Sequence, residues 1–354
     1  MKRILSLLPL FLTFFATAAA PAAPAAPIFG GNLPPIRPAF VAADTPQFEL
    51  ALTYLKRGDV ARAATLEWEV LWDPNGSYDY RGIDASIKLM ARKGVIPLWL
   101  LQPSPHPSSP WYQTTWTDPW LPKRELWPAV VTMNTNVVQH IISESKKYLG
   151  YPPLFQIWNE PQGGKPGGST TSKFGEWVPD MHELFYLLVS DLRSKGIPKS
   201  QLVAPAMSGF GEGTRGEAAE FASMMPPPEF DWLSECGFRA CHIRFSATWA
   251  NGNTTYIRQG FQNNIDWVFW LMSRQKWPVG QKVLVTEFYV TPGDCGVPMG
   301  TDMYPYHAIA FDILKASPFS HVLAWGLRPG ETDNPNDPWS QYGGLGQSLV
   351  RWRG

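Results

Sequence analysis

Residues 81–101 read RGIDASIKLMARKGVIPLWLL and contain the repeating unit of the predicted fold. Residues 81–93 have the mixed apolar and polar pattern of an amphipathic helix, and Gly94 supplies its end. Residues 95–101 form a continuous apolar run, which is typical of a strand buried on both faces. Helices that alternate with such strands predict a parallel sheet covered by helices.

The same alternation extends over most of the chain. Predicted strands lie at residues 40–42, 65–71, 95–101, 154–158, 202–206, 238–245, 283–286 and 321–325. Predicted helices lie at residues 48–64, 81–93, 126–148, 181–195, 256–275 and 304–316. Only the short stretch 344–352 remains after the eighth strand, so we expect the last helix to be truncated or reduced. We therefore predict an α/β fold, a single-domain (β/α)8 TIM barrel over residues 38–354.

The N-terminus has the layout of a secretory signal peptide. Met1-Lys2-Arg3 is basic, residues 4–15 are mostly apolar, and residues 16–20 are small. The apolar run is shorter than the roughly 20 residues that a membrane-spanning helix needs. We predict a signal peptide at 1–20, a Pro/Ala-rich linker at 21–37, and a secreted or periplasmic protein with no integral membrane segment after cleavage.

Charge and metal-ligand spacing exclude several classes of function. Lys plus Arg and Asp plus Glu each number 30, so nucleic-acid binding is not expected. The six histidines show no zinc-like spacing, and we expect no metal or other cofactor. If one disulfide forms among the three cysteines, neighbouring predicted strands favour Cys241–Cys295 and leave Cys236 free. We expect a monomer.

Two glutamates stand at the ends of predicted strands. Glu160 follows the fourth strand in Trp158-Asn159-Glu160-Pro161, and Glu287 ends the seventh in Thr286-Glu287-Phe288. Catalytic residues of a (β/α)8 barrel lie at the C-terminal ends of its strands. Strands four and seven lie roughly opposite in the ring, so these two carboxyl groups can meet over the barrel mouth. Retaining hydrolysis of a glycosidic bond needs such a pair, about 5–5.5 Å apart.

Both motifs, in this order, resemble the signatures of the clan A glycoside hydrolases, which are retaining (β/α)8 enzymes. The resemblance implies a carbohydrate substrate, Glu160 as general acid/base, Asn159 as donor to the sugar 2-hydroxyl, and Glu287 as nucleophile. Trp325, at the end of strand eight, matches the aromatic platform of these enzymes, although a tryptophan in the barrel core is the alternative interpretation. The most similar branch holds β-xylosidases and bacterial exopolysaccharide endoglycosidases. The resemblance to clan members extends to the spacing of Trp68, Pro74, Gly76, Tyr78 and Asp84.

Two positions depart from the pattern of this clan. Ala63 stands where many members carry an arginine on strand two, with Arg62 next to it. On strand six, His242 matches a histidine that contacts the nucleophile, but Arg244 replaces the aromatic residue two positions later. Arg244 is therefore a candidate to supply the missing cation.

Aromatic residues are dense in the loop at 103–127, which includes Trp111. Such density suits several sugar subsites and favours cleavage within a polysaccharide, although these rings can also pack the loop itself. We predict an endo-acting retaining β-glycosidase of a β-linked polysaccharide or oligosaccharide. The predicted substrate-binding residues are Asn159, His242, Trp325, Arg244 and Trp111. The alternative is a catalytically inactive barrel that binds glycans, which the two departures favour and the two intact glutamates oppose.

Overall fold

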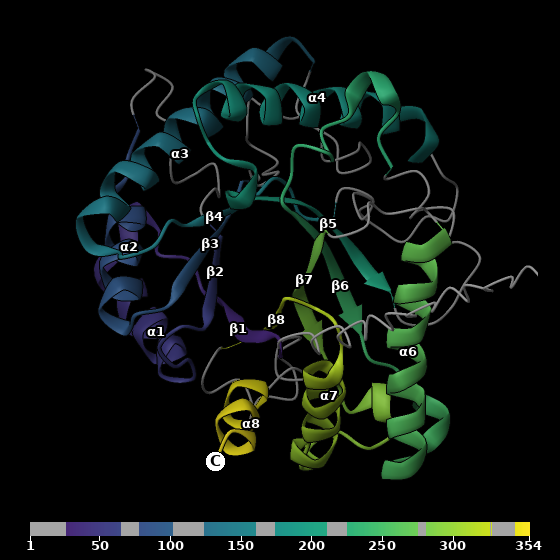
Figure 1. Cartoon of the computed structure of the whole chain (residues 1–354). Coiled ribbons are helices and arrows are strands. Elements are labelled where there is room, and N and C mark those ends of the chain that lie inside the picture. Colours follow the sequence, from purple (N-terminus) through teal and green to yellow (C-terminus); the bar gives the residue numbers. More distant parts are fainter. Residues whose placement is uncertain are drawn as a thin grey trace, which may run out of the picture.

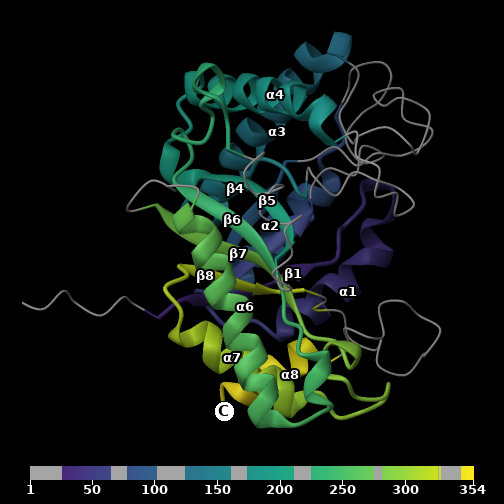
Figure 2. The ribbon, with the colours of Figure 1, turned by 90° about the vertical axis from the view of Figure 1, so that its right-hand side faces the viewer.

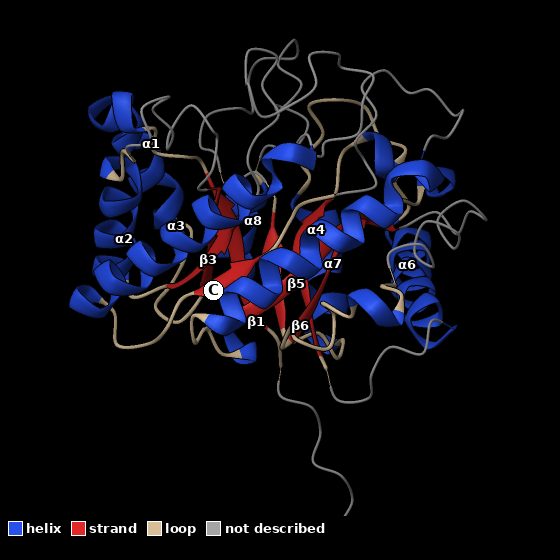
Figure 3. Cartoon of the chain, turned by 90° about the horizontal axis from the view of Figure 1, so that it is seen from above, coloured by secondary structure: helices blue, strands red, loops and turns tan. Residues whose placement is uncertain are grey.

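A closed barrel of eight parallel strands forms the centre of the protein, in the order β1 to β8 along the chain. The computed structural model describes residues 26–64, 78–101, 124–160, 174–210, 225–274, 281–325, 327 and 344–354. Figure 1 looks along the barrel, with the helices outside the ring of strands. In the side view of Figure 3 the strands lie between layers of helices. The predicted (β/α)8 fold is confirmed.

The strands and helices have the following bounds. The strands are β1 Ile28–Leu33, β2 Val60–Ala64, β3 Ile96–Leu100, β4 Leu154–Gln156, β5 Leu202–Phe210, β6 Phe238–Arg244, β7 Lys282–Tyr289 and β8 His321–Ala324. The α-helices are α1 Val41–Thr53, α2 Arg81–Lys93, α3 Trp127–Tyr148, α4 Phe174–Ser194, α6 Thr254–Arg274, α7 Tyr304–Ala316 and α8 Leu345–Trp352. No helix of the described residues has both the length and the hydrophobicity to cross a membrane.

Helix α2 shows how local sequence sets the elements. Ile83, Ile87 and Met90 lie on one face of the helix and are buried. Gly94 has φ of 74°, in the left-handed region that suits glycine, and its amide donates to the carbonyls of the last turn. The chain then enters β3. The predicted helix at 81–93 is confirmed, as is the one at 304–316.

The predictions for the first elements were wrong. The predicted strand at 40–42 falls at the start of α1, the predicted helix at 48–64 ends at Thr53, and β2 takes its last residues. Strand β1 lies inside the predicted linker 21–37, so the barrel begins at Ile28 rather than at residue 38. A Cβ on Gly30 would lie 1.9 Å from the carbonyl oxygen of Val60, so β1 needs glycine at this position. The signal peptide at 1–20 and the strand at 65–71 lie outside the described residues.

A core of side chains fills the barrel. It contains Val60, Leu98, Leu154, Val203, Ala206, Phe238, Ala240, Leu284 and Leu323, which come from β2 to β8. A larger apolar cluster joins the outside of the strands to the helices. In Figure 2, α6 lies nearest to the viewer, outside β6 and β7. The lower part of the barrel is therefore a packed core, and functional side chains are expected at its C-terminal end.

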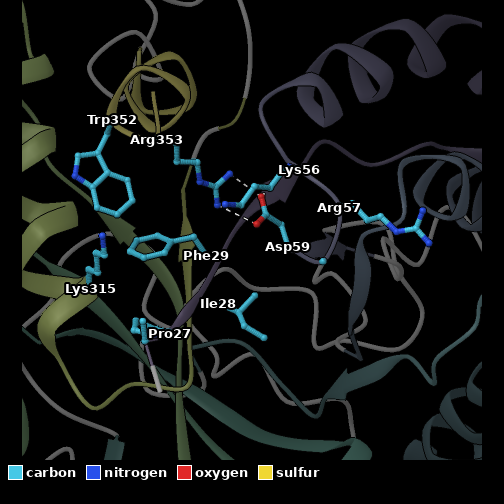
Figure 4. A pocket seen from close by; sticks show the side chains of 11 residues that line it. Pro27, Ile28, Phe29, Lys56, Arg57, Asp59, Lys315, Trp352 and Arg353 are labelled. Carbon is cyan, nitrogen blue, oxygen red and sulfur yellow. Dashed lines mark hydrogen bonds and ion pairs between the residues drawn. The ribbon is translucent and has the colours of Figure 1, made fainter. Parts of the chain in front are cut away.

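Short helix α8 closes the seam between β1 and β8, and the expected reduction of the last helix is confirmed. Trp352 packs against Phe29 with ring centroids 5.1 Å apart. Arg353 donates to both carboxylate oxygens of Asp59, at 2.7 and 2.9 Å, and both side chains are largely buried. These groups line a pocket of about 480 Å³, and Figure 4 shows the Arg353–Asp59 pair beside it.

The three cysteines are buried and free, so the conditional Cys241–Cys295 disulfide is not formed.

Candidate active site

Glu160 and Glu287 extend from the C-terminal ends of two strands. Glu287 is part of β7, whereas Glu160 follows β4 and its amide donates to the carbonyl of Ala206 on β5, at 2.8 Å. The φ angle of Glu160 is 40°, in the left-handed region that a residue with a Cβ rarely adopts. Such strained backbone is concentrated at functional sites, where surrounding contacts hold it in place.

The two carboxyl groups face each other with His242 between them. One carboxylate oxygen of each glutamate and a ring nitrogen of His242 all lie within 4.8 Å of one another. The Nδ1 atom of His242 is 2.7 Å from Oε1 of Glu160, and its Nε2 atom is 3.5 Å from Oε1 of Glu287. The side chain of Glu160 is 38% exposed and that of Glu287 is 9% exposed. The site is therefore more open to solvent at Glu160.

Arg62 holds the polar groups of the site together. Its Nη1 atom donates to Oε1 of Glu287 at 2.5 Å and to Oδ1 of Asn32 at 2.7 Å. Its Nε atom donates to Oε1 of Gln156 at 2.8 Å, and its Nη2 atom donates to Oδ1 of Asn159 at 2.6 Å. The planar guanidinium group thus fixes side chains from β1, β4 and β7 in one geometry.

Two of these contacts orient other groups. The carbonyl oxygen of Asn159 accepts from Arg62, which places the amide NH2 of Asn159 on the side away from the guanidinium group. Asn32 donates from Nδ2 to the backbone carbonyls of Thr286 on β7 and Ala324 on β8, at 3.0 and 3.2 Å. Asn32, on β1, therefore connects Arg62 across the β1–β8 seam to β7 and β8.

The cation beside Glu287 comes from Arg62, so the prediction that Arg244 supplies it was wrong. Arg244 donates from Nε and Nη2 to Oδ1 of the buried Asp294, both at 2.9 Å. Its side chain is 45% exposed. The arginine of strand two is present one residue away from the position expected at Ala63. Because neighbouring side chains of a strand point to opposite faces, only Arg62 of the two can enter the barrel beside Glu287.

The remaining predicted substrate-binding residues have different outcomes. Trp325 follows β8, is partly exposed, and its amide donates to the carbonyl of Phe288 at 2.9 Å. It therefore stands at the C-terminal end of the barrel, next to the strand of Glu287. Trp111 lies outside the described residues.

Neighbouring groups set the ionisation of Glu160. Burial is the largest influence and raises its pKa, but the charge of His242, the hydrogen bond from His242 and the charge of Arg62 together outweigh it. The pKa of Glu160 is therefore held below its ordinary value. When Glu160 carries a proton on Oε2, its Oε1 atom can still accept from Nδ1 of His242, which leaves that proton free for another acceptor.

The same three residues are the group that a metal ion could use among the described part of the chain. However, each ring nitrogen of His242 is directed to a different carboxylate, and Arg62 already contacts the Glu287 oxygen. Glu160 with His242 and Glu287 with Arg62 are therefore hydrogen-bonded or ion-paired groups rather than ligands around one ion, and the buried Nε2 atom of His242 has no hydrogen-bond partner among the described residues.

Sequence reasoning did not identify Asn32, Arg62 and Gln156 as residues of the site. Asn32 lay in the predicted linker, and Gln156 gave no signal beyond its place in a strand, two residues before the Trp-Asn-Glu motif. A buried position in a strand is unusual for a glutamine and an arginine. An apolar strand that contains such a residue indicates a polar partner inside the barrel. Gln156, in the predicted strand 154–158, carries this signal, whereas Arg62 fell in the predicted helix 48–64.

Comparison with known proteins supports the fold. No protein-family model and no curated protein matches the sequence. A GH5-4 broad-specificity endoglucanase from Clostridium acetobutylicum superposes with a TM-score of 0.55 and 13% identity, covering 91% of this chain and 96% of that one. The catalytic domain of a GH26 endo-β-1,4-mannanase from Bacillus sp. JAMB-750 gives 0.58 and 13%, covering 92% and 85%. A modular endo-β-1,4-mannanase from Cellulomonas fimi gives 0.54 and 15%, covering 93% and 70%.

Proposed function

We propose that this protein is a retaining β-glycosidase that cleaves within a β-linked polysaccharide. The observation that carries the proposal is the spacing of Glu160 and Glu287, whose nearest carboxylate oxygens lie within 4.8 Å. Retaining glycosidases hold their carboxyl groups about 5–5.5 Å apart, whereas inverting enzymes need about 6.5–9.5 Å to admit a water molecule. The resemblance of both motifs to clan A, and the fold shared with glycoside hydrolases, support the same reaction.

In the first step, the carboxylate of Glu287 attacks the anomeric carbon while the bond to the leaving oxygen breaks. Arg62 holds Oε1 of Glu287, which fixes the direction of the carboxylate and leaves Oε2 for attack. Glu160 gives its proton to the leaving oxygen. Asn159, with its carbonyl oxygen on Arg62, presents its NH2 group to the sugar 2-hydroxyl.

In the second step, water attacks the glycosyl ester and Glu160 accepts the proton of that water. The bond to Glu287 breaks, and the product keeps its original configuration after two inversions. The Nδ1 atom of His242, 2.7 Å from Oε1 of Glu160, can donate to that oxygen in both steps and so keeps the carboxyl group in place while Oε2 gives up and accepts the proton.

Variants of the two glutamates test the assignment. Glu287→Gly removes the nucleophile, so hydrolysis of every substrate should stop, and added azide should give a glycosyl azide of inverted configuration. Glu160→Ala should lose about 10²–10⁴-fold on natural glycosides but keep the first step on aryl glycosides with good leaving groups, and azide should then give retained configuration. Glu49→Gln, in an exposed ion pair, is the control. Azide products of the reverse configurations would contradict the roles.

The substrate panel follows from the sequence and from the neighbours. The endoglucanase and mannanase neighbours are the reason to begin with soluble β-1,4-glucan and β-1,4-mannan. The resemblance to a branch with xylosidases and exopolysaccharide endoglycosidases adds xylan and bacterial exopolysaccharides. Product sizing separates endo from exo cleavage, because internal cleavage releases long fragments first.

The inactive glycan-binding barrel is not favoured. Its basis was the two departures, on strands two and six. Arg62 takes the place of the strand-two arginine beside Glu287, although Arg244 still replaces the aromatic residue on strand six. A protein that only binds glycans has no need for paired carboxyl groups held by an arginine and a histidine.

We also propose export, on the basis of the basic, apolar and small segments of residues 1–20. Mass spectrometry of protein from its native host should then give a first residue between about 19 and 24. Intact Met1 on cytoplasmic protein would contradict export.

A further inference from the structure

Two aromatic side chains stand exposed in the segment that follows β6. Trp249 lies in the short helix Thr248–Ala250, and Tyr256 lies in the first turn of α6. Their side chains are 57% and 55% exposed. Their ring centroids are 5.8 Å apart, with the planes tilted by 41°. We call Trp249 and Tyr256 the aromatic pair.

The aromatic pair lies at the end of the barrel that carries the candidate catalytic residues. Trp249 comes seven residues after His242, so their Cα atoms lie at most about 25 Å apart. Segments that follow the strands of a (β/α)8 barrel carry its substrate-binding groups. A polysaccharide bound across Glu160 and Glu287 extends several sugar rings beyond the cleaved bond, and such a chain can reach the aromatic pair.

The backbone beneath the aromatic pair is fixed by the neighbouring segment after β7. The amide of Ala247 donates to the carbonyl of Asp294 at 2.7 Å, and the amide of Gly252 donates to the carbonyl of Cys295 at 2.8 Å. The side chain of Asn253 accepts from the amides of Thr255 and Tyr256, which caps α6. These rings are therefore exposed on an ordered surface, and a rigid support lowers the entropy cost of binding.

Another exposed tryptophan of the same helix has a different environment. Trp270 is 43% exposed but stacks on Trp267 with ring centroids 4.7 Å apart and planes tilted by 12°. The guanidinium group of Arg274 lies over its ring at 5.1 Å. Trp270 is about 24 Å along α6 from Thr254, toward the opposite end of the barrel. It is therefore a matched control for exposure on α6 away from the catalytic end.

We propose that Trp249 and Tyr256 form a distal binding subsite for the polysaccharide chain, on which successive sugar rings stack by their apolar C–H faces. The inference rests on the proposed glycosidase function, because that function defines which chain crosses the barrel mouth. The pair contributes affinity for long chains and takes no part in bond cleavage.

Binding and hydrolysis are measured separately to test this subsite. The Glu287→Gln protein, which lacks the proposed nucleophile and should not cleave the chain, is examined by affinity electrophoresis in gels with hydroxyethylcellulose, galactomannan or xylan, alone and combined with Trp249→Ala, Tyr256→Ala or Trp270→Ala. Truncating an aromatic contact of about 0.5–1.5 kcal/mol should weaken retardation by roughly two- to twelvefold for Trp249→Ala and Tyr256→Ala. Trp249→Phe should restore much of it, and Trp270→Ala should match the parent.

The outcomes separate this subsite from the proposed function. Equal retardation of Trp249→Ala and its parent, or no retardation of the parent by any of the three polysaccharides, would overturn the subsite. Failure of the proposed function is seen in hydrolysis instead of binding. The protein with both glutamates intact would then release no reducing ends from these polysaccharides and no phenol from aryl β-glycosides. Retardation that depends on Trp249 without any hydrolysis would keep the glycan-binding subsite and refute the glycosidase.

Discussion

Replacement of Arg62 should damage both stability and catalysis, because one guanidinium group serves four side chains. Arg62→Met keeps most of the apolar stem and removes every donor. It leaves Oε1 of Glu287, Oδ1 of Asn32 and Oε1 of Gln156 without their present partner. The side chains of Arg62 and Glu287 are only 4% and 9% exposed, so water replaces the lost donors poorly.

The expected loss follows from the burial of these groups. Removal of one partner of a buried ion pair costs about 3–5 kcal/mol, because the remaining charge stays desolvated. Each unpaired neutral acceptor adds about 1–3 kcal/mol before the site relaxes, and these terms are not additive. We therefore expect Arg62→Met to lower the free energy of unfolding by at least about 3 kcal/mol, which is a large part of the 5–15 kcal/mol of a typical domain.

Arg62→Lys provides a second variant that keeps the charge. An ammonium group cannot reach acceptors on four side chains at once, so Glu287 and Asn159 should lose their fixed positions. We expect kcat to fall by about 10²-fold, with a smaller loss of stability. Urea denaturation and hydrolysis of an aryl glycoside measure the two effects.

The exposed pair Arg92–Glu49 supplies the control for Arg62. These side chains are 69% and 50% exposed, and such pairs contribute about 0–1 kcal/mol. Arg92→Met should therefore change little. The reasoning would be refuted if Arg62→Met were as stable as Arg92→Met, or if Arg62→Lys kept the full kcat.

Three further predictions concern other parts of the structure. Burial raises the pKa of Glu160, but the charge and hydrogen bond of His242, together with the charge of Arg62, hold it below its ordinary value. His242→Gln should therefore raise that pKa. An acid with a raised pKa stays protonated to higher pH, so the alkaline limb of kcat/KM should move upward; a limb that moves downward contradicts this. At φ of 40°, Glu160→Gly should be about 1 kcal/mol more stable than Glu160→Ala in urea denaturation, and equal stability would show that the backbone is unstrained. Arg353→Met leaves the buried Asp59 without its cation, with the backbone amide of Lys56 still donating to it, and should lower the free energy of unfolding by about 3 kcal/mol, whereas a loss near that of Arg92→Met would mean that water replaces the guanidinium group.

The sequence predicted the barrel best where an amphipathic pattern had a clear end. Helices at 81–93 and 304–316 have the predicted bounds because an apolar face and a clear end stood together in each. The first strand was missed for the opposite reason. Its Gly30-Gly31 pair follows a Pro/Ala run and has the composition of a linker, whereas Gly30 is required by its close approach to Val60.

For the candidate site, sequence alone identified the two glutamates and their position on opposite sides of the barrel mouth. It did not identify the side chains that hold them. The contacts of Arg62 with Asn32 on β1 and with Glu287 on β7 join residues distant in the chain, and no local pattern encodes such partners. The arginine expected at position 63 stands at position 62, and for this reason Arg244 was considered as the source of the cation beside Glu287.

The ion pair between Asp59 and Arg353 also bears on how the protein is made. The two residues are separated by 294 positions, so this pair forms only after residue 353 has been synthesised. The ring itself closes when β1 pairs with β8, which requires the chain up to residue 324. Until then both β1 and the growing sheet present unpaired edges, which can associate with other chains. Contacts of such long range slow folding, since the entropy of a very long loop is lost before they form. The edges of the unfinished sheet are therefore open to such association until β8 has been synthesised.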